Sequence, residues 1–113
     1  MASAFSEKDW LYMKSVREEL LVALCGKINR ACAAILASQG ETEHARYLRL
    51  YTYIGAADEI VAECFDDWKR SGISQKACSL HRHGLLTAAH LEQLSPAARN
   101  CITIFASLLK RKT

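Results

Sequence analysis

The sequence lacks the motifs that most enzymes, redox proteins and metal sites need. It has no glycine-rich phosphate loop, no Cys-x-x-Cys pair, and no Ser/His/Asp or Cys/His set in a recognisable local context. Its five cysteines are odd in number and most fall on apolar stripes, which is typical of reduced, buried thiols and not of a disulfide framework. We therefore expect no enzymatic activity and no cofactor.

Uninterrupted apolar runs are also missing. No stretch of about 18 residues is both uncharged and apolar throughout. The first six residues lack the basic region followed by an apolar region that marks a signal peptide. These absences predict a soluble, cytoplasmic protein that does not cross a membrane. At 113 residues, half of them hydrophobic, residues 1–113 should form a single domain with its own core.

What is present is helical periodicity. Apolar residues recur at three- and four-residue steps between Trp10 and Ile35, which predicts a helix over residues 7–38 with Ser6 as its N-cap. A second repeat predicts a helix over residues 42–70. Because only a few residues separate the two, they should lie antiparallel as a hairpin of residues 7–71.

Shorter helices should follow the hairpin. Their ranges are residues 74–83, 87–94 and 96–110, the last beginning at the only proline of the chain. A basic tail of residues 110–113 ends the sequence. The predicted fold is therefore all-α: a long antiparallel hairpin with two or three shorter C-terminal helices, in the manner of a helical bundle.

Residues 31–37 are apolar on every side of the first helix. A helix that is hydrophobic all round has to be covered all round. The first helix should be roughly 46 Å long and the last only about 22 Å, at 1.5 Å per residue. Either the C-terminal helices wrap this end or a second subunit does, and we expect self-association as a two-fold dimer.

Charge is divided unevenly along the chain. Residues 1–68 contain 7 basic and 11 acidic residues, whereas residues 69–113 contain 8 basic residues and one acid, Glu92. The basic third could pack on the acidic hairpin, or it could bind nucleic acid. The candidate basic patch consists of Lys69, Arg70, Lys76, Arg82, Lys110, Arg111 and Lys112.

The second helix carries the candidate surface for a protein partner. Its acidic residues lie close to a segment rich in tyrosine and arginine, which are favoured at interfaces. Tyr47 and Tyr51 fit the core stripe, so that Tyr53 should be the exposed tyrosine. The candidate surface consists of Arg46, Arg49, Tyr53, Glu59, Glu63, Asp66 and Asp67. A non-enzymatic interaction or regulatory role, including self-association, is the predicted function.

Two polar residues, Arg17 and Asp58, interrupt apolar stripes and are predicted to be buried. Asp67 or Glu63 should be the partner of Arg17. Asp58 could set the register of the hairpin or bind a ligand. Cys78 and His81, three residues apart, could share a metal ion, but a buried thiol with histidines near a helix C-terminus is the favoured interpretation. No metal site is expected.

Overall fold

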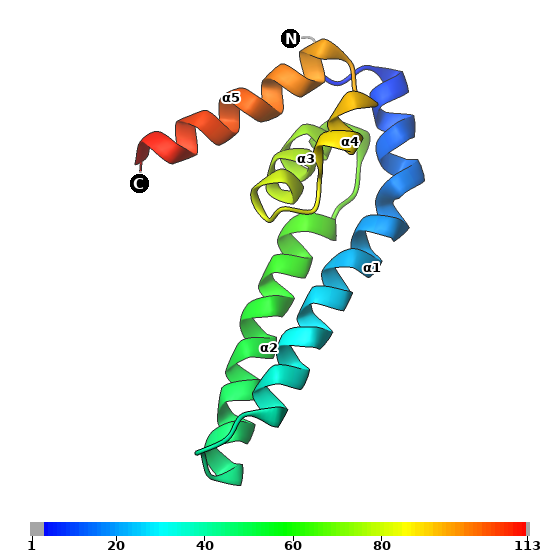
Figure 1. The fold of residues 1–113 in the computed structure, drawn as a ribbon. Helices are drawn as coiled ribbons and strands as arrows, with labels where there is room; N and C mark the ends of the chain where they lie inside the picture. Colours follow the sequence, from blue (N-terminus) through cyan, green and yellow to red (C-terminus); the bar gives the residue numbers. More distant parts are fainter. Residues whose placement is uncertain (1–3, 113) are drawn as a thin grey trace.

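The computed structural model describes residues 4–112, and the side chains of residues 4–110. It confirms the all-α prediction, because the described residues are mostly helical and form no strand (Figure 1). The elements are α1 (Glu7–Ala37), α2 (Glu43–Phe65), a 3-10 turn η1 (Arg70–Gly72), α3 (Ile73–Arg82), α4 (Ala88–Glu92) and α5 (Pro96–Lys112).

α1 and α2 form the predicted hairpin, and side chains cap both helix N-termini. At the start of α1 the Ser6 hydroxyl accepts from the Asp9 amide at 3.1 Å, and the Asp9 carboxylate accepts from the Ser6 amide at 2.9 Å. This is a capping box. Thr42 caps α2 by accepting from the Ala45 amide at 3.0 Å. Five residues, 38–42, therefore reverse the chain (Figure 1).

α2 ends at Phe65, so the prediction of a helix through residue 70 was wrong. Two side chains from elsewhere in the chain donate hydrogen bonds to carbonyls at the end of α2, which a further helical turn would otherwise bind. Lys76 Nζ donates to the Glu63 carbonyl at 2.9 Å, and Arg17 Nη2 donates to the Phe65 carbonyl at 3.3 Å. Asp67 then adopts a left-handed φ of 54°. The chain folds back so that the Trp68 ring stacks on Phe65, with centroids 5.6 Å apart.

The hydrophobic core lies at one end of the molecule. It joins the N-terminal half of α1 and the end of α2 to α3, α4 and the start of α5 (Figure 1). Its largest fully buried apolar side chains are Met13, Leu20, Ile73, Leu80 and Ile102. The molecule is elongated, with extents of 54 × 32 × 24 Å, because the hairpin continues well beyond this core.

Asp9 ties the two ends of the chain together inside this core. Its carboxylate also accepts from the Ser95 amide at 2.8 Å and from the Ser95 hydroxyl at 2.6 Å. Ser95 in turn caps α5 by accepting from the Ala98 amide at 3.2 Å. A single buried carboxylate thus joins the N-termini of α1 and α5.

The far end of the hairpin is covered by no other part of the described chain. Within the segment 31–37, Ala33, Ala34, Leu36 and Ala37 are exposed, and the C-terminal helices pack near the opposite end (Figure 1). The sequence left two ways to cover this segment, by the C-terminal helices or by a second subunit. The described C-terminal helices do not cover it.

α1 is also long and apolar enough to cross a membrane, judged by length and composition alone. Its most apolar 18-residue window has a mean hydropathy of 1.7, and only 11% of that window is buried. This property was not expected from the sequence, because Lys27 and Arg30 interrupt the apolar run. A core helix of a globular protein would be mostly buried, so the exposure of α1 needs a physical explanation.

Candidate functional site

Exposed apolar side chains of the hairpin, with the half-buried Cys32, form two aligned series. On α1, Val22, Cys25, Cys32 and Leu36 lie on one side, together with Asn29. The five positions alternate steps of three and four residues, so at about 100° per residue they fall within an arc of roughly 80°. On α2 the series is Tyr47, Tyr51 and Ile54. The rings of the two tyrosines are 6.5 Å apart.

Both series face the same side of the hairpin. α1 and α2 are right-handed helices that run antiparallel. On each helix, residues about 100° beyond the line of contact, counted toward the C-terminus, therefore face the same side of the pair. The opposite side is identified by a cavity of about 230 Å³ that Lys27 of α1, Ala56 of α2 and His83 line together. Lys27 Nζ donates there to the His83 carbonyl at 3.4 Å. α3 therefore covers that side, and the two apolar series lie on the other.

We name this surface the hairpin flank and define it as Val22, Cys25, Cys32, Leu36, Tyr47, Tyr51 and Ile54. Val22 lies at its border, because it also lines a cavity of about 510 Å³ with Gly84, Thr87 and His90, which follow α3. Tyr47 is 60% exposed and Tyr51 69% exposed. Their exposed area together is on the order of 250 Å², for aromatic side chains of about 150–250 Å² each. None of the seven residues is charged. The flank is therefore mainly apolar and larger than scattered surface hydrophobics produce, with the exposed carboxylate of Asp58 at the end of its α2 series.

The predicted order of tyrosine burial is reversed. Tyr53 is the half-buried tyrosine, whereas Tyr47 and Tyr51 are exposed. The core stripe expected from the spacing of Tyr47 and Tyr51 would have required a covering helix. No described part of the chain supplies one.

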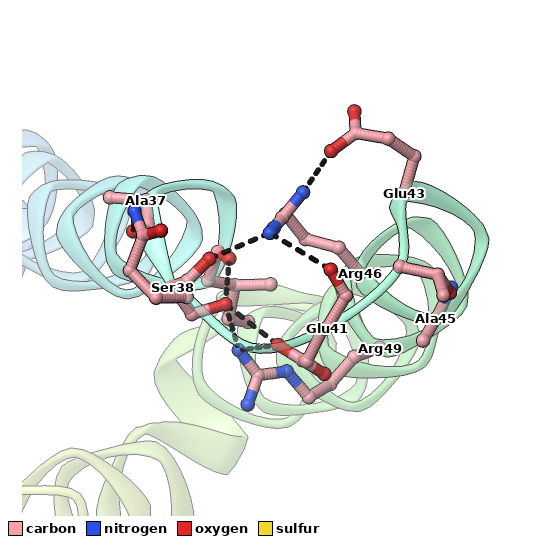
Figure 2. A network of polar contacts seen from close by, with 10 residues as sticks. Ala37, Ser38, Glu41, Glu43, Ala45, Arg46 and Arg49 are labelled. Atoms are coloured by element: carbon pink, nitrogen blue, oxygen red, sulfur yellow. Dashed lines mark hydrogen bonds and ion pairs between the residues drawn. The ribbon is translucent and has the colours of Figure 1, made fainter.

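Arg46 and Arg49 lie at the hairpin turn and hold it closed (Figure 2). Arg46 Nη2 donates to the Ser38 carbonyl at 2.7 Å and to the Glu41 carbonyl at 3.4 Å, while Nη1 pairs with Glu43. Arg49 Nη2 reaches the Ser38 hydroxyl at 2.9 Å and the Glu41 carboxylate at 3.0 Å. Because these groups bind their own turn, they are structural in the single chain.

The acidic residues predicted for an interaction surface are not gathered on one face. Glu63 is paired with Arg82 and, at 3.3 Å, with His83. Glu59 is exposed on α2, while Asp66 and Asp67 belong to the turn that follows α2. Burial raises the pKa of Glu63, but hydrogen bonds from Ser79 and Arg82 and the nearby positive charges outweigh it, so that the pKa lies below its usual value.

Three residues of the candidate basic patch lie against the acidic hairpin. Arg70 Nε pairs with Glu7 at 2.5 Å, Arg82 pairs with Glu63, and Lys76 donates to the Glu63 carbonyl. Lys69 is exposed beside η1 and Lys110 is exposed near the end of α5. The side chains of Arg111 and Lys112 lie outside those that the structure describes. This arrangement supports charge complementarity within the chain for part of the patch.

The two polar residues predicted to be buried differ in outcome. Asp58 is exposed, so its predicted burial was wrong: its position on α2 continues the series of Tyr51 and Ile54 on the uncovered side. Arg17 is half-buried opposite the end of α2, as expected. Its partners are the Phe65 carbonyl and the rings of Phe65 and Trp68, at 5.6 and 5.4 Å, and not a carboxylate.

The cysteines are free, but only Cys64 and Cys78 are buried. The prediction that most of the thiols are buried was therefore wrong, and Cys25 is exposed on the hairpin flank. Burial, followed by interaction with Cys101, raises the pKa of Cys78 to about 11. That environment suits a buried thiol better than a metal ligand shared with His81.

Among the described residues, one group has ligand atoms close enough for a metal ion: Glu63, Cys64 and His83, within 4.8 Å of one another. The Arg82 guanidinium already pairs with Glu63. Burial, and then the negative charge of Glu63, raise the pKa of Cys64 to about 11. A metal would have to displace the arginine and deprotonate this thiol, so the geometry does not favour a metal centre.

Comparison of this chain with protein-family models, with curated proteins and with solved structures gives no match.

Proposed function

We propose that this protein is a non-enzymatic interaction module that self-associates through the hairpin flank as a two-fold dimer. The observation that carries the proposal is the flank itself: seven uncharged residues on one side of α1 and α2, opposite the side that α3 covers. In a two-fold dimer the same flank serves both copies, so that four helices would pack together.

The size of the flank fits such an interface. Val22 is 61% exposed and Leu36 57% exposed, and these add to the area of the two tyrosines. A standard interface buries about 800 Å² on each partner, and these exposed side chains would supply the apolar part of that area. Tyrosine is favoured as an interface anchor because it buries a large area at a low cost in side-chain entropy.

Asn29 supports a second copy in particular. It is exposed in the middle of the α1 series, between Cys25 and Cys32, and it is the one polar member of that series. An asparagine side chain both donates and accepts, so that it can pair with the same residue across a two-fold axis. A single asparagine in an apolar helical interface is known to fix register and oligomeric state.

Two other partners of the protein, a lipid bilayer and nucleic acid, receive less support. A bilayer would have to accommodate Lys27 and Arg30 in the middle of α1, which is costly unless both snorkel or find partners. Nucleic acid would require a free basic surface, whereas Arg70, Lys76 and Arg82 are held by groups of the hairpin. A gel shift at about 50 mM salt tests nucleic-acid binding, because phosphate contacts are strongest at low salt.

The test compares two flank variants, Leu36→Glu and Tyr51→Glu, with the control Ile104→Glu. Ile104 on α5 is 61% exposed, close to the 57% of Leu36, but lies away from the flank. Sedimentation equilibrium should give about twice the 12.6 kDa chain mass for the wild type and for Ile104→Glu, and the mass of one chain for both flank variants.

Three results would contradict the proposal. The first is a monomeric wild type at every concentration. The second is a control variant that dissociates as readily as the flank variants. The third is a wild type that floats with lipid vesicles and loses this property in Leu36→Glu, which would assign the flank to a membrane.

A further inference from the structure

A cavity of about 510 Å³ lies between α1 and the residues that follow α3. Lys27 and Arg30 line it from α1, and Gly84 and Thr87 line it from the connection between α3 and α4. The cavity lies on the side of α1 away from the hairpin flank and shares only Val22 with it. Its volume lies within the range of about 300–1,000 Å³ that small-molecule sites occupy.

Two glycines let the basic groups of this cavity lie close to the backbone. A Cβ atom at Gly26 would lie 3.3 Å from Arg30 Nη1, so the guanidinium lies against α1 at this position. A Cβ atom at Gly84 would lie 3.8 Å from Lys27 Nζ. Gly84 has a φ of +76°, a conformation that favours glycine. Both basic groups therefore lie over glycines that line the cavity.

The positive charges of Lys27 and Arg30 are not neutralised within the described chain. Neither residue forms an ion pair with the part of the chain that the structure describes. Lys27 Nζ donates to the His83 carbonyl at 3.4 Å, a contact that supplies no negative charge. Because the two residues lie three positions apart on one helical face, their charges repel each other. A bound anion would remove this repulsion.

Glu19, the acid that lines the cavity, lies at its other end and already has a partner. Its carboxylate accepts from His90 Nε2 at 2.9 Å. The Thr87 amide donates to Nδ1 of the same imidazole at 3.0 Å, so that Nε2 carries the donated proton. Lys27 is eight positions beyond Glu19, which is about 12 Å along α1. The cavity therefore has one end that is positive and one end that is paired internally.

We propose that this cavity binds a phosphate monoester, with its phosphate group between Lys27 and Arg30. A phosphate monoester carries about 1.5 to 2 negative charges at neutral pH, which matches the two cations. The arginine fork binds phosphate oxygens through parallel hydrogen bonds, and lysine adds a compact positive charge. Ala23 and Leu85 also line the cavity and would contact the organic part of the ester.

The test follows the binding of phenyl phosphate to the full chain in proton–nitrogen correlation spectra. The amide signals of Gly26 and Gly84 should shift in a saturable way, with an affinity that falls as salt is added. Phenol, which lacks the phosphate, should leave both signals unchanged. Arg30→Gln and Lys27→Gln should each weaken binding by about tenfold, because each removes a charge-assisted hydrogen bond. Both side chains are exposed, so neither substitution disturbs the core.

Two variants serve as controls. Lys8→Gln removes the same charge as Lys27→Gln from an exposed position at the beginning of α1, and it should bind like the wild type. Tyr51→Glu should be monomeric and should still bind phenyl phosphate, whereas Arg30→Gln should still dimerise. Loss of one activity with retention of the other would separate this proposal from dimerisation.

A lipid headgroup could supply the same chemistry, so phosphatidylcholine vesicles that contain phosphatidic acid form a second arm of the test. Cosedimentation that is lost in Arg30→Gln would identify a lipid as the source of the phosphate. Binding of phenyl phosphate without cosedimentation would identify a soluble ester. Three results would overturn the proposal: neither phenyl phosphate nor the vesicles bind, phenol causes the same shifts, or Arg30→Gln binds as tightly as Lys8→Gln.

Discussion

The Asp9 carboxylate accepts hydrogen bonds from Ser6 and from both the amide and the hydroxyl of Ser95, residues that lie far apart in the sequence. Burial raises its pKa, but these hydrogen bonds outweigh burial, so that the pKa lies below its ordinary value of 3.8. A carboxyl group with a lowered folded-state pKa stabilises the fold above its unfolded pKa. That stabilisation is lost as the pH falls through the folded pKa.

We predict that Asp9→Asn lowers the free energy of unfolding at neutral pH by about 1–3 kcal/mol, since charge-assisted hydrogen bonds to two helix N-termini are lost. Chemical denaturation across acidic pH should show a smaller loss of stability below about pH 4 than in the wild type. Glu18→Gln, at an exposed position of α1, serves as the control. If the free energy of unfolding of Asp9→Asn falls with decreasing pH as steeply as that of the wild type, the Asp9 carboxylate is not the group that makes stability depend on pH.

Cys64 and Cys78 provide a second prediction about single residues. Burial raises the pKa of each to about 11, so that on the order of one in a thousand is thiolate at pH 8. Both should resist alkylation by iodoacetamide until the protein unfolds. Cys25, which is exposed in the monomer, should react in the folded protein when it is dilute enough to be monomeric. Peptide mass mapping measures each site, and rapid native labelling of Cys64 would refute the packing described for the end of α2.

Single residues were hardest to predict from sequence where burial depends on which side of a helix is covered. Tyr47, Tyr51 and Asp58 all have the helical spacing of an apolar stripe on α2. That spacing alone does not say which of two adjoining stripes of the helix packs against the core. The position of Arg17 opposite the end of α2 could be predicted from the hairpin turn. Its aromatic and carbonyl partners could not, because they depend on where α2 stops.

At the level of helices, local capping signals predicted the boundaries well. Ser6, Thr42 and Pro96 mark the beginnings of α1, α2 and α5, and each signal acts within one turn. The end of α2 had no comparable local signal. It is set by contacts with Lys76 and Arg17, which are distant in sequence, and by stacking of Trp68 on Phe65.

Substitutions at two glycines test the structure of α2 and of the hairpin turn. Gly55 is exposed in the interior of α2, and an added methyl group would meet nothing within 4 Å. Gly40 in the hairpin turn has a φ of +84°. We predict that Gly55→Ala raises the free energy of unfolding by about 0.5–1 kcal/mol and that Gly40→Ala lowers it by about 1–2 kcal/mol. Denaturant titration measures both, and a destabilised Gly55→Ala would indicate that α2 is interrupted there.

On the scale of the whole molecule, the core lies at one end and the hairpin extends beyond it. From the sequence, residues 31–37 were expected to need covering by the C-terminal helices or by a second subunit, and the structure leaves much of that segment exposed. The sequence did not show which side of the hairpin remains open. That depends on His83, at the end of α3, lying beside Lys27 and Ala56, a long-range contact with no local signal.

Alkylation of Cys25 at different protein concentrations tests the proposed coverage of the hairpin flank most directly. Cys25 is exposed in the single chain, and a second copy would cover it. The account predicts that its reaction with iodoacetamide slows as the protein is concentrated, while in the variant Tyr51→Glu it is rapid at every concentration. A wild-type rate that is rapid at all concentrations would contradict a dimer formed through this surface.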